Sequence, residues 1–256
     1  MGRLNDRVAL ITGGGAGIGE ACVRRFATEG ACVLIADMEA ERGQALAAEI
    51  GDLALFHSTD VADESQFSAA VETAVAAWGK LDIVVNNAGV VVPAAPVQDT
   101  TSQEFNLLIE VNIRGVFHGC KIAYPYLKQS KGCVVNIASM AGVSGQANHA
   151  IYGATKGAVN ALTRCTAVDW GREGIRINAI CPACVLTERT QDWINAQPDA
   201  AEAAAALSKI HSLQRAAEPS EIAAAAVYLC SDDASFVTGC IMPVSGGSEC
   251  GYKMDD

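Results

Sequence analysis

Short runs of apolar residues alternate with longer stretches of helical spacing along most of this chain, and that alternation constrains the fold more than any other feature. The short runs are rich in Val, Ile, Leu and Cys and are mostly continuous, which is typical of strands covered on both faces. Seven strands are expected, at residues 8–12, 32–36, 53–57, 81–86, 133–137, 175–180 and 241–244. Because helical stretches separate these runs, the pattern predicts an α/β fold with a parallel sheet between two layers of helices.

The helical stretches indicate a single domain. They are expected at residues 18–28, 39–50, 64–78, 102–129, 151–170 and 220–229. No internal repeat and no Gly/Ser/Pro-rich linker divides the 256 residues, half of which are hydrophobic. We therefore expect one domain over residues 1–256 that buries about 70–75% of the surface of the unfolded chain.

One segment departs from the alternation. About sixty residues separate the sixth and seventh expected strands, and residues 187–218 among them are Ala-rich and amphipathic. Insertions at the carboxyl ends of strands commonly cover ligands. This position predicts a substrate lid over residues 187–218, with a surface helical hairpin as the alternative.

Composition narrows the class of protein. The net charge of −11 disfavours nucleic acid as a partner, because a polyanion is repelled by such a surface on average. No apolar run approaches the roughly 20 residues that cross a bilayer, and the polar residues 1–6 do not resemble a signal peptide. Ten scattered cysteines favour a reduced, cytoplasmic protein. The four histidines show no metal-ligand spacing with them, so no metal is expected.

A glycine-rich turn follows the first expected strand. In the segment 12–19, Thr-Gly-Gly-Gly-Ala-Gly-Ile-Gly, glycines permit positive φ and a close approach of the backbone to a pyrophosphate. The phosphate would then meet the free N–H groups at the start of the next helix. The turn therefore predicts a dinucleotide site.

Asp37 ends the second expected strand, eighteen residues after Gly19. A carboxylate at this place accepts hydrogen bonds from ribose hydroxyls and repels a 2′-phosphate. No Arg or Lys lies at positions 13–19. The pattern predicts NAD rather than NADP, the alternative being that Asp37 only caps the following helix.

Tyr152 and Lys156 are four residues apart on an expected helix and so share one face. A nearby ammonium lowers the pKa of a phenol, which makes proton transfer with an alcohol feasible near neutral pH. Ser139 follows the fifth expected strand, where a hydroxyl can hold a reacting oxygen. Each feature by itself is common.

Taken in order, the motifs resemble the short-chain dehydrogenase/reductase family over nearly the whole chain, from Asn5 to about Gly247. The matching segments are 12–19, 60–61 (Asp-Val), 86–89 (Asn-Asn-Ala-Gly), Asn112, Ser139, Tyr152, Lys156, Pro182 and Thr187. The resemblance implies a single Rossmann-type, doubly wound domain with strand order 3-2-1-4-5-6-7. It also implies cofactor contacts from Gly13, Gly15, Ala16, Gly17, Ile18, Asp37, Asp60, Val61, Asn87, Ala88, Gly89, Tyr152, Lys156, Pro182, Val185 and Thr187.

The family resemblance further implies a catalytic tetrad of Asn112, Ser139, Tyr152 and Lys156. Tyr152 would exchange a proton with the substrate oxygen that Ser139 positions. Lys156 would lower the pKa of Tyr152 and bind ribose, and Asn112 would hold a water that relays protons. Family members are mostly homotetramers built through the helices at 102–129 and 151–170 and the last strand.

The resemblance implies a small-molecule alcohol or ketone as the substrate. Pocket candidates by position are Gln146, His149, Cys184, Trp193 and His211. Residues 145–147 and 246–252 are similar to members that act on L-fucose and related aldoses and to 17β-hydroxysteroid dehydrogenase type 14. This favours NAD-linked oxidation of a sugar, cyclic alcohol or steroid hydroxyl. A 3-oxoacyl-thioester reductase is the alternative, and a non-catalytic NAD-binding sensor or scaffold is a remote one.

Two departures stand near the sixth strand. Ala183 occupies a place where the family usually has glycine, so a required positive φ there would be strained. Cys181 and Cys184 have the spacing of a redox Cys-x-x-Cys, but they end a late strand of a dinucleotide fold. A buried Cys181 beside a pocket-lining Cys184 is the expectation.

Overall fold

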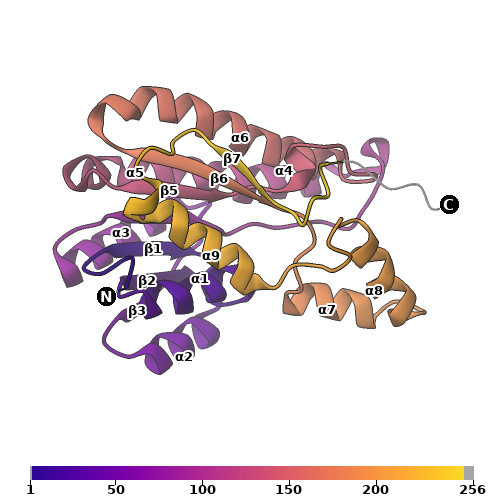
Figure 1. Cartoon of the computed structure of the whole chain (residues 1–256), viewed down its shortest axis with the longest axis horizontal. Coiled ribbons are helices and arrows are strands. Elements are labelled where there is room, and N and C mark those ends of the chain that lie inside the picture. The colour runs from indigo at the N-terminus through magenta and orange to yellow at the C-terminus, as the bar shows by residue number, and fades with distance from the viewer. Residues whose placement is uncertain (1, 251–256) are drawn as a thin grey trace.

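The computed structural model describes residues 2–250, and its seven strands form one parallel sheet in the order β3-β2-β1-β4-β5-β6-β7 (Figure 1). The strands are β1 (Val8–Thr12), β2 (Cys32–Asp37), β3 (Ala54–Ser58), β4 (Ile83–Asn86), β5 (Cys133–Ile137), β6 (Arg176–Pro182) and β7 (Ile241–Val244). Each pairing along this order is parallel. The expected strand order is confirmed, and the strand ends match the prediction or differ from it by one or two residues.

Helices cover both faces of the sheet, as predicted (Figure 1). The helices are α1 (Gly17–Thr28), α2 (Ala40–Ile50), α3 (Glu64–Trp78), α4 (Ser102–Ile109), α5 (Gly115–Ser130), α6 (Ala150–Trp170), α7 (Glu188–Asn195), α8 (Ala200–Lys209) and α9 (Pro219–Cys230). One core lies between the sheet and α1, α2 and α9, and the other between the sheet and α3, α5 and α6. β1, β4 and β5 are buried along their whole length, which explains their continuous apolar sequences.

The long helix expected at residues 102–129 contains a local change of hydrogen bonding. A π-helical segment, η2 (Glu110–Arg114), joins α4 to α5. Such segments are rare and occur frequently at functional sites. Asn112 lies in this segment and is fully buried.

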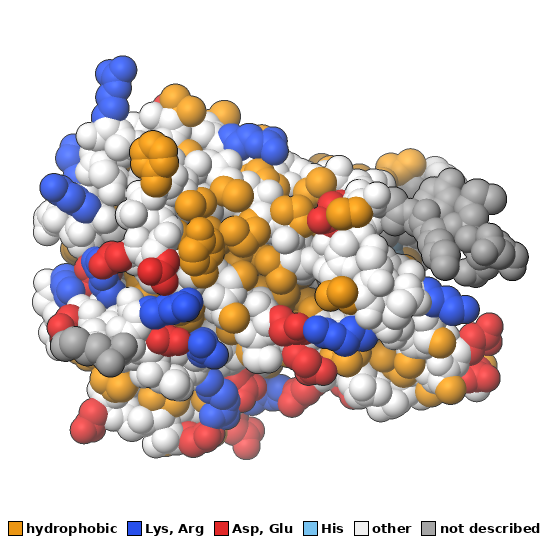
Figure 2. Space-filling model, in the orientation of Figure 1, with side chains coloured by type: hydrophobic (Ala, Val, Ile, Leu, Met, Phe, Trp, Pro, Cys, Tyr) orange, Lys and Arg blue, Asp and Glu red, His pale blue; other side chains and the backbone are white. Residues whose placement is uncertain are grey.

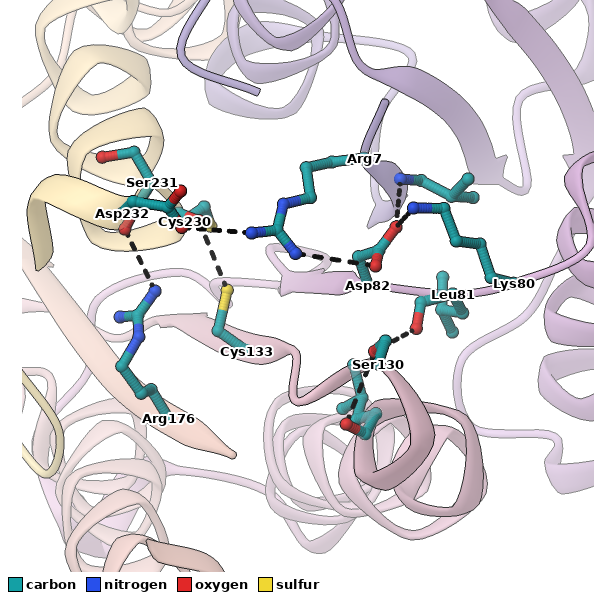
Figure 3. A network of polar contacts seen from close by, with 12 residues as sticks. Arg7, Lys80, Leu81, Asp82, Ser130, Cys133, Arg176, Cys230, Ser231 and Asp232 are labelled. Carbon is teal, nitrogen blue, oxygen red and sulfur yellow. Dashed lines mark hydrogen bonds and ion pairs between the residues drawn. The ribbon is translucent and has the colours of Figure 1, made fainter. Parts of the chain in front are cut away.

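The amino edge of the sheet is closed by charged side chains (Figure 3). Asp82 accepts a hydrogen bond from the Val8 amide and pairs with Lys80 at 3.0 Å and with Arg7 at 3.7 Å. Arg176 donates to the carbonyl of Leu229, near the end of α9, at 2.6 Å. A cavity of about 470 Å³ lies at this edge, opposite the carboxyl ends of the strands. Because its arginines already have partners within the chain, we assign these residues a structural role.

Residues 187–218 contain α7 and α8, which project at one end of the molecule (Figure 1). Among residues 2–250, no helix is long and apolar enough to cross a membrane. Ala183 is not among the described residues with positive φ, so its backbone carries no strain of that kind. In the tail at 246–252, positions 251 and 252 lie outside the described residues.

Candidate active site

The predicted site residues gather where β1, β4, β5 and β6 end. Parallel strands place their carboxyl ends at one edge of the sheet, so loops that are far apart in sequence meet there. The glycine turn follows β1, Asn87 follows β4, and Ser139 follows β5. The helix α6 brings Tyr152 and Lys156 to the same edge.

The geometry of the glycine turn fits a dinucleotide. Gly13 and Gly17 have φ of 61° and 56°, and a Cβ on Gly13 would lie 2.9 Å from Ala88 Cα. The N-cap residue of α1 is Ala16, and no side chain of the described residues accepts a hydrogen bond at this helix N-terminus. The free N–H groups of α1 therefore face a cradle of glycines, which suits a pyrophosphate.

Thr12 and Asn87 hold this turn against the loop after β4. The Thr12 hydroxyl accepts hydrogen bonds from the Asn87 and Ala88 amides at 2.9 and 3.0 Å. The Asn87 side chain donates to the carbonyls of Thr12 and Gly13 at 2.8 and 3.0 Å. Thr12 is 2% exposed, so it organises the site from beneath. The sequence motif contained Thr12, but only the structure shows this role.

We expect Thr12→Val to lower the free energy of unfolding by about 1–3 kcal/mol, because two amides lose their acceptor in a buried place. Urea unfolding of the variant and the wild type measures this difference. Thr73→Val on α3 is the matched control, since among the described residues the Thr73 hydroxyl bonds only the carbonyl of Ala69 in its own helix. Equal stability of the two variants would contradict the anchoring role of Thr12.

The Asp37 carboxylate lies beside the glycine turn. Its Oδ2 accepts a hydrogen bond from the Gly15 amide at 2.8 Å, and its Oδ1 accepts from the Glu39 amide at 3.0 Å. The N-cap residue of α2 is Glu39, so Asp37 is not the N-cap of that helix. Each carboxylate oxygen retains a lone pair. Asp37 is therefore placed and free to accept from ribose hydroxyls.

Ser139 and Tyr152 face each other at the end of β5. Ser139 begins the short helix η3 (Met140–Gly142), where its hydroxyl accepts a hydrogen bond from the Ala141 amide at 3.1 Å. Burial raises the pKa of Tyr152, and a hydrogen bond with Ser139 acts in the opposite direction. The net direction differs from the lowered pKa that the sequence predicted for Tyr152, because desolvation of the phenol is the largest cause.

Lys156 is buried beneath Tyr152. Its Nζ donates to the Ile137 carbonyl at 2.9 Å and lies 5.8 Å from the centre of the Tyr152 ring. Burial lowers the pKa of Lys156 from 10.5 to about 8. The ammonium is therefore held near the phenol in a place that disfavours its charge.

The side chains of Asn112 and Lys156 both lie beside Gly89. A Cβ on Gly89 would be 3.3 Å from Asn112 Oδ1 and 3.4 Å from Lys156 Nζ. The Asn112 side chain pairs with both backbone groups of Val90, accepting at 2.8 Å and donating at 2.9 Å. It also donates to the Thr155 hydroxyl at 3.3 Å. The π-helical segment thus ties the loop after β4 to the catalytic helix.

The remaining predicted cofactor residues surround this edge. Val61 is buried, and its carbonyl oxygen lies 2.9 Å from His118 Nδ1. Asp60 Oδ1 accepts from the Ala62 amide at 2.9 Å. Pro182 is the last residue of β6, and Val185 is buried in the segment that follows. Thr187 is the N-cap residue of α7, and its side chain accepts a hydrogen bond from the Thr190 amide. Their cofactor contacts stay predictions.

The predicted substrate residues divide by exposure. The ring of His149 lies edge-on to Tyr152 with centres 6.2 Å apart, and its Nδ1 is 2.8 Å from the Ala147 carbonyl. Gln146 and Trp193 are exposed, and Cys184 is half-buried. His211 is instead 1% exposed, with Nδ1 2.6 Å from the Ser245 carbonyl.

Neither cysteine of the Cys-x-x-Cys pair lies in a place that favours a thiolate. Cys181 and Cys184 are both free thiols, and burial raises the pKa of each. Raised pKa values disfavour the reactive thiolate. Among residues 2–250, no group of three or more His, Cys, Asp and Glu has the geometry to hold a metal ion.

Comparisons with known proteins place this site in a family. A family model described as enoyl-(acyl carrier protein) reductase matches residues 13–249. A cyclopentanol dehydrogenase of Comamonas testosteroni is 41% identical over 96% of this chain and 98% of that protein. An L-fucose dehydrogenase of Oryctolagus cuniculus is 39% identical over 97% of this chain and 87% of that protein. A 3-alpha-(or 20-beta)-hydroxysteroid dehydrogenase of Mycobacterium tuberculosis is 40% identical over 100% and 94%.

Solved structures of similar proteins have the same fold. Levodione reductase has a TM-score of 0.92 at 36% identity, over 97% of this chain and 100% of that chain. A 3-ketoacyl-(acyl-carrier-protein) reductase of Brucella melitensis complexed with NADH has a TM-score of 0.88 at 34% identity, over 96% and 99%. ElxO with NADP bound has a TM-score of 0.90 at 31% identity, over 96% and 99%. The fold and site thus define a nicotinamide-dependent oxidoreductase that acts on alcohol and carbonyl groups. The chain belongs to the short-chain dehydrogenase/reductase family.

Proposed function

We propose that this protein interconverts a secondary alcohol and its carbonyl compound with NAD as the cofactor. The observation that carries the proposal is the convergence of Ser139, Tyr152 and Lys156 beside an uncapped helix N-terminus and a glycine cradle. The relatives named above act on a cyclic alcohol, a sugar and steroids. We infer that the substrate is a hydroxyl of one of these kinds.

The residues divide the work of the reaction among themselves. In oxidation, Tyr152 accepts the proton of the substrate hydroxyl, whose oxygen the Ser139 hydroxyl orients. Lys156 places a positive charge near the phenol, which favours the phenolate that this step requires. Asn112 fixes the loop after β4 through Val90. The nicotinamide cofactor, when bound, supplies the hydride acceptor.

The substrate class can be tested by following NADH formation with cyclopentanol, L-fucose and a 3α-hydroxysteroid. We expect one of them to be turned over with NAD, and the Ser139→Ala variant to lose that activity. A 3-oxoacyl thioester reduced more efficiently than any of these alcohols is oxidised would favour the alternative reductase function. NAD binding without turnover of any compound would favour the sensor or scaffold.

Asp37 supports NAD over NADP, and its substitution gives a direct prediction. We expect Asp37→Asn to lower kcat/KM for NAD by about 10- to 100-fold, because hydrogen bonds to a charged acceptor contribute about 1.5–3 kcal/mol. The value for NADP should rise or stay unchanged, because the repulsion of a 2′-phosphate is removed. Steady-state kinetics with both cofactors check this, and an equal loss with both would contradict the role of Asp37.

We also propose that the protein is a cytoplasmic homotetramer. Phe117 on α5 and Val168 on α6 are 46% and 80% exposed, on the helices that the family resemblance assigns to the interfaces. Hydrophobic side chains also gather over α9 and β7 (Figure 2). Large exposed apolar areas of this kind favour burial against another chain. A mass near that of one chain in light scattering would contradict the assembly.

A further inference from the structure

The lid begins with three consecutive residues that contact three separate parts of the cofactor region. A Cβ on Gly17, in the glycine turn, would lie 3.1 Å from the Thr187 methyl group. Glu188 pairs with Arg42 on α2, with Oε2 2.5 Å from Nη1. Arg189 donates to the carbonyl of Val91, in the loop after β4, at 2.6 Å. The start of α7 therefore lies across the carboxyl edge of the sheet.

Arg42 lies close to the group that selects the cofactor. A Cβ on Gly15 would lie 3.1 Å from Asp37 Oδ2 and 3.6 Å from Arg42 Cβ, so both residues border the same glycine. The Arg42 side chain is 54% exposed, so its guanidinium is accessible to a ligand. A guanidinium in this place suits a phosphate, because its planar donors match phosphate oxygens.

Glu188 removes Arg42 from that use. Its carboxylate forms the ion pair with the guanidinium, so the charge and the donors of Arg42 are already engaged. We propose that Glu188 is a specificity-determining residue that disfavours NADP by holding Arg42 away from the 2′-phosphate. This inference rests on the proposed use of a nicotinamide dinucleotide and extends it to a residue outside the cofactor motifs.

The place of Glu188 at the start of the lid affects the choice between NAD and NADP. Glu188 is the first residue of α7, so it reaches Arg42 only while the start of the lid lies across the site. The same segment is held by the hydrogen bond of Arg189 to Val91. Discrimination between the two cofactors is thus coupled to the position of the lid, although Glu188 lies 146 residues from Arg42 in sequence.

The test measures binding directly. Isothermal titration calorimetry gives Kd for NAD and NADP with the full-length wild type and with Glu188→Gln. We expect Glu188→Gln to tighten NADP binding about 3- to 10-fold and to change NAD binding less than about 2-fold, since exposed charges interact weakly. The gain should shrink as salt is raised, because screening shortens the reach of the charges.

Glu49→Gln is the matched control. Glu49 pairs with Arg24 at 2.6 Å, is 61% exposed against 67% for Glu188, and loses the same charge when substituted. An equal gain in NADP binding with Glu49→Gln would show an effect of net charge and overturn the proposal. Both pairs are exposed, so both variants should fold as the wild type does.

The double variant Arg42→Gln/Glu188→Gln isolates the role of the arginine. We expect it to lose most of the gain seen with Glu188→Gln, because the phosphate has no released guanidinium to bind. A gain that persists in the double variant overturns the sequestration of Arg42. Unchanged NADP binding in Glu188→Gln, with normal NAD binding, overturns this inference alone. Failure of the wild type to bind either cofactor would overturn the proposed function as well.

Discussion

Replacing Tyr152 with phenylalanine is expected to lower kcat by about 10²- to 10⁴-fold, the usual contribution of a positioned proton-transfer group. The substitution removes the phenolic oxygen and leaves the ring in place. Tyr152 lies opposite Ser139 and above the Lys156 ammonium, so no other phenol of the described residues is placed to exchange the proton. KM for the cofactor should change little, because the ring and the glycine turn remain.

The measurement is NAD-linked oxidation of the alcohol that the wild type uses best. Tyr124→Phe is the matched control. The Tyr124 hydroxyl donates a hydrogen bond to Glu173 Oε2 at 2.8 Å, and this pair does not lie at the carboxyl edge of the sheet. The Tyr152→Phe protein should remain folded, with about 1 kcal/mol lost at most from its hydrogen bond. Full activity of Tyr152→Phe would show that the proposed mechanism is wrong.

Replacing Lys156 with methionine is expected to abolish most activity and to raise the free energy of unfolding at pH 7. Methionine has a similar length and no charge. The ammonium is buried, its only hydrogen bond in the described residues goes to a carbonyl oxygen, and burial lowers its pKa from 10.5 to about 8. A shift of that size corresponds to about 3 kcal/mol of cost to the folded state when the lysine is charged. We expect the variant to recover about 1–3 kcal/mol of it.

The pH dependence has a definite sign. Below pH 8, the lysine is protonated in both the folded and the unfolded chain, and the full cost of burying its charge is present. Between pH 8 and 10.5 the folded protein loses the proton first, so this cost falls as the pH rises. The stability advantage of Lys156→Met should therefore shrink over that window and vanish above it.

Chemical unfolding of both proteins at pH 7 and pH 10 measures the advantage. Lys121→Met is the matched control, because Lys121 is exposed and pairs with Glu64. Its effect should be small and should not follow the same pH window. A Lys156→Met variant less stable than the wild type at pH 7 would contradict the cost assigned to the buried ammonium.

Much of the fold follows from short-range patterns. The central strands are buried on both faces, so every one of their positions favours an apolar side chain. Continuous apolar runs in the sequence therefore indicate them. The glycine turn and the pair Tyr152 and Lys156 are equally local, because a tight turn and an i,i+4 spacing involve few residues. The family resemblance added the strand order and Asn112. No spacing pattern in the sequence around Asn112 indicates a functional residue.

Tertiary structure decided the features that join distant segments. The Thr12 hydroxyl meets Asn87 only because β1 and β4 are neighbours in the sheet. The π-helical segment turns Asn112 toward Val90, which no periodicity of residues 102–129 indicated. The pKa of Tyr152 depends on how deeply the phenol is buried, and this reversed the direction expected from its neighbour Lys156.

The sequence by itself determined an α/β fold and predicted the residues of its candidate site, because each depends on which residues stand a few positions apart. Only the tertiary structure decided that the first turn of α7 lies across that site and that Glu188 meets Arg42. The physical reason is that such a contact depends on the packing of whole elements. Neither residue carries a local signal for a partner 146 positions away.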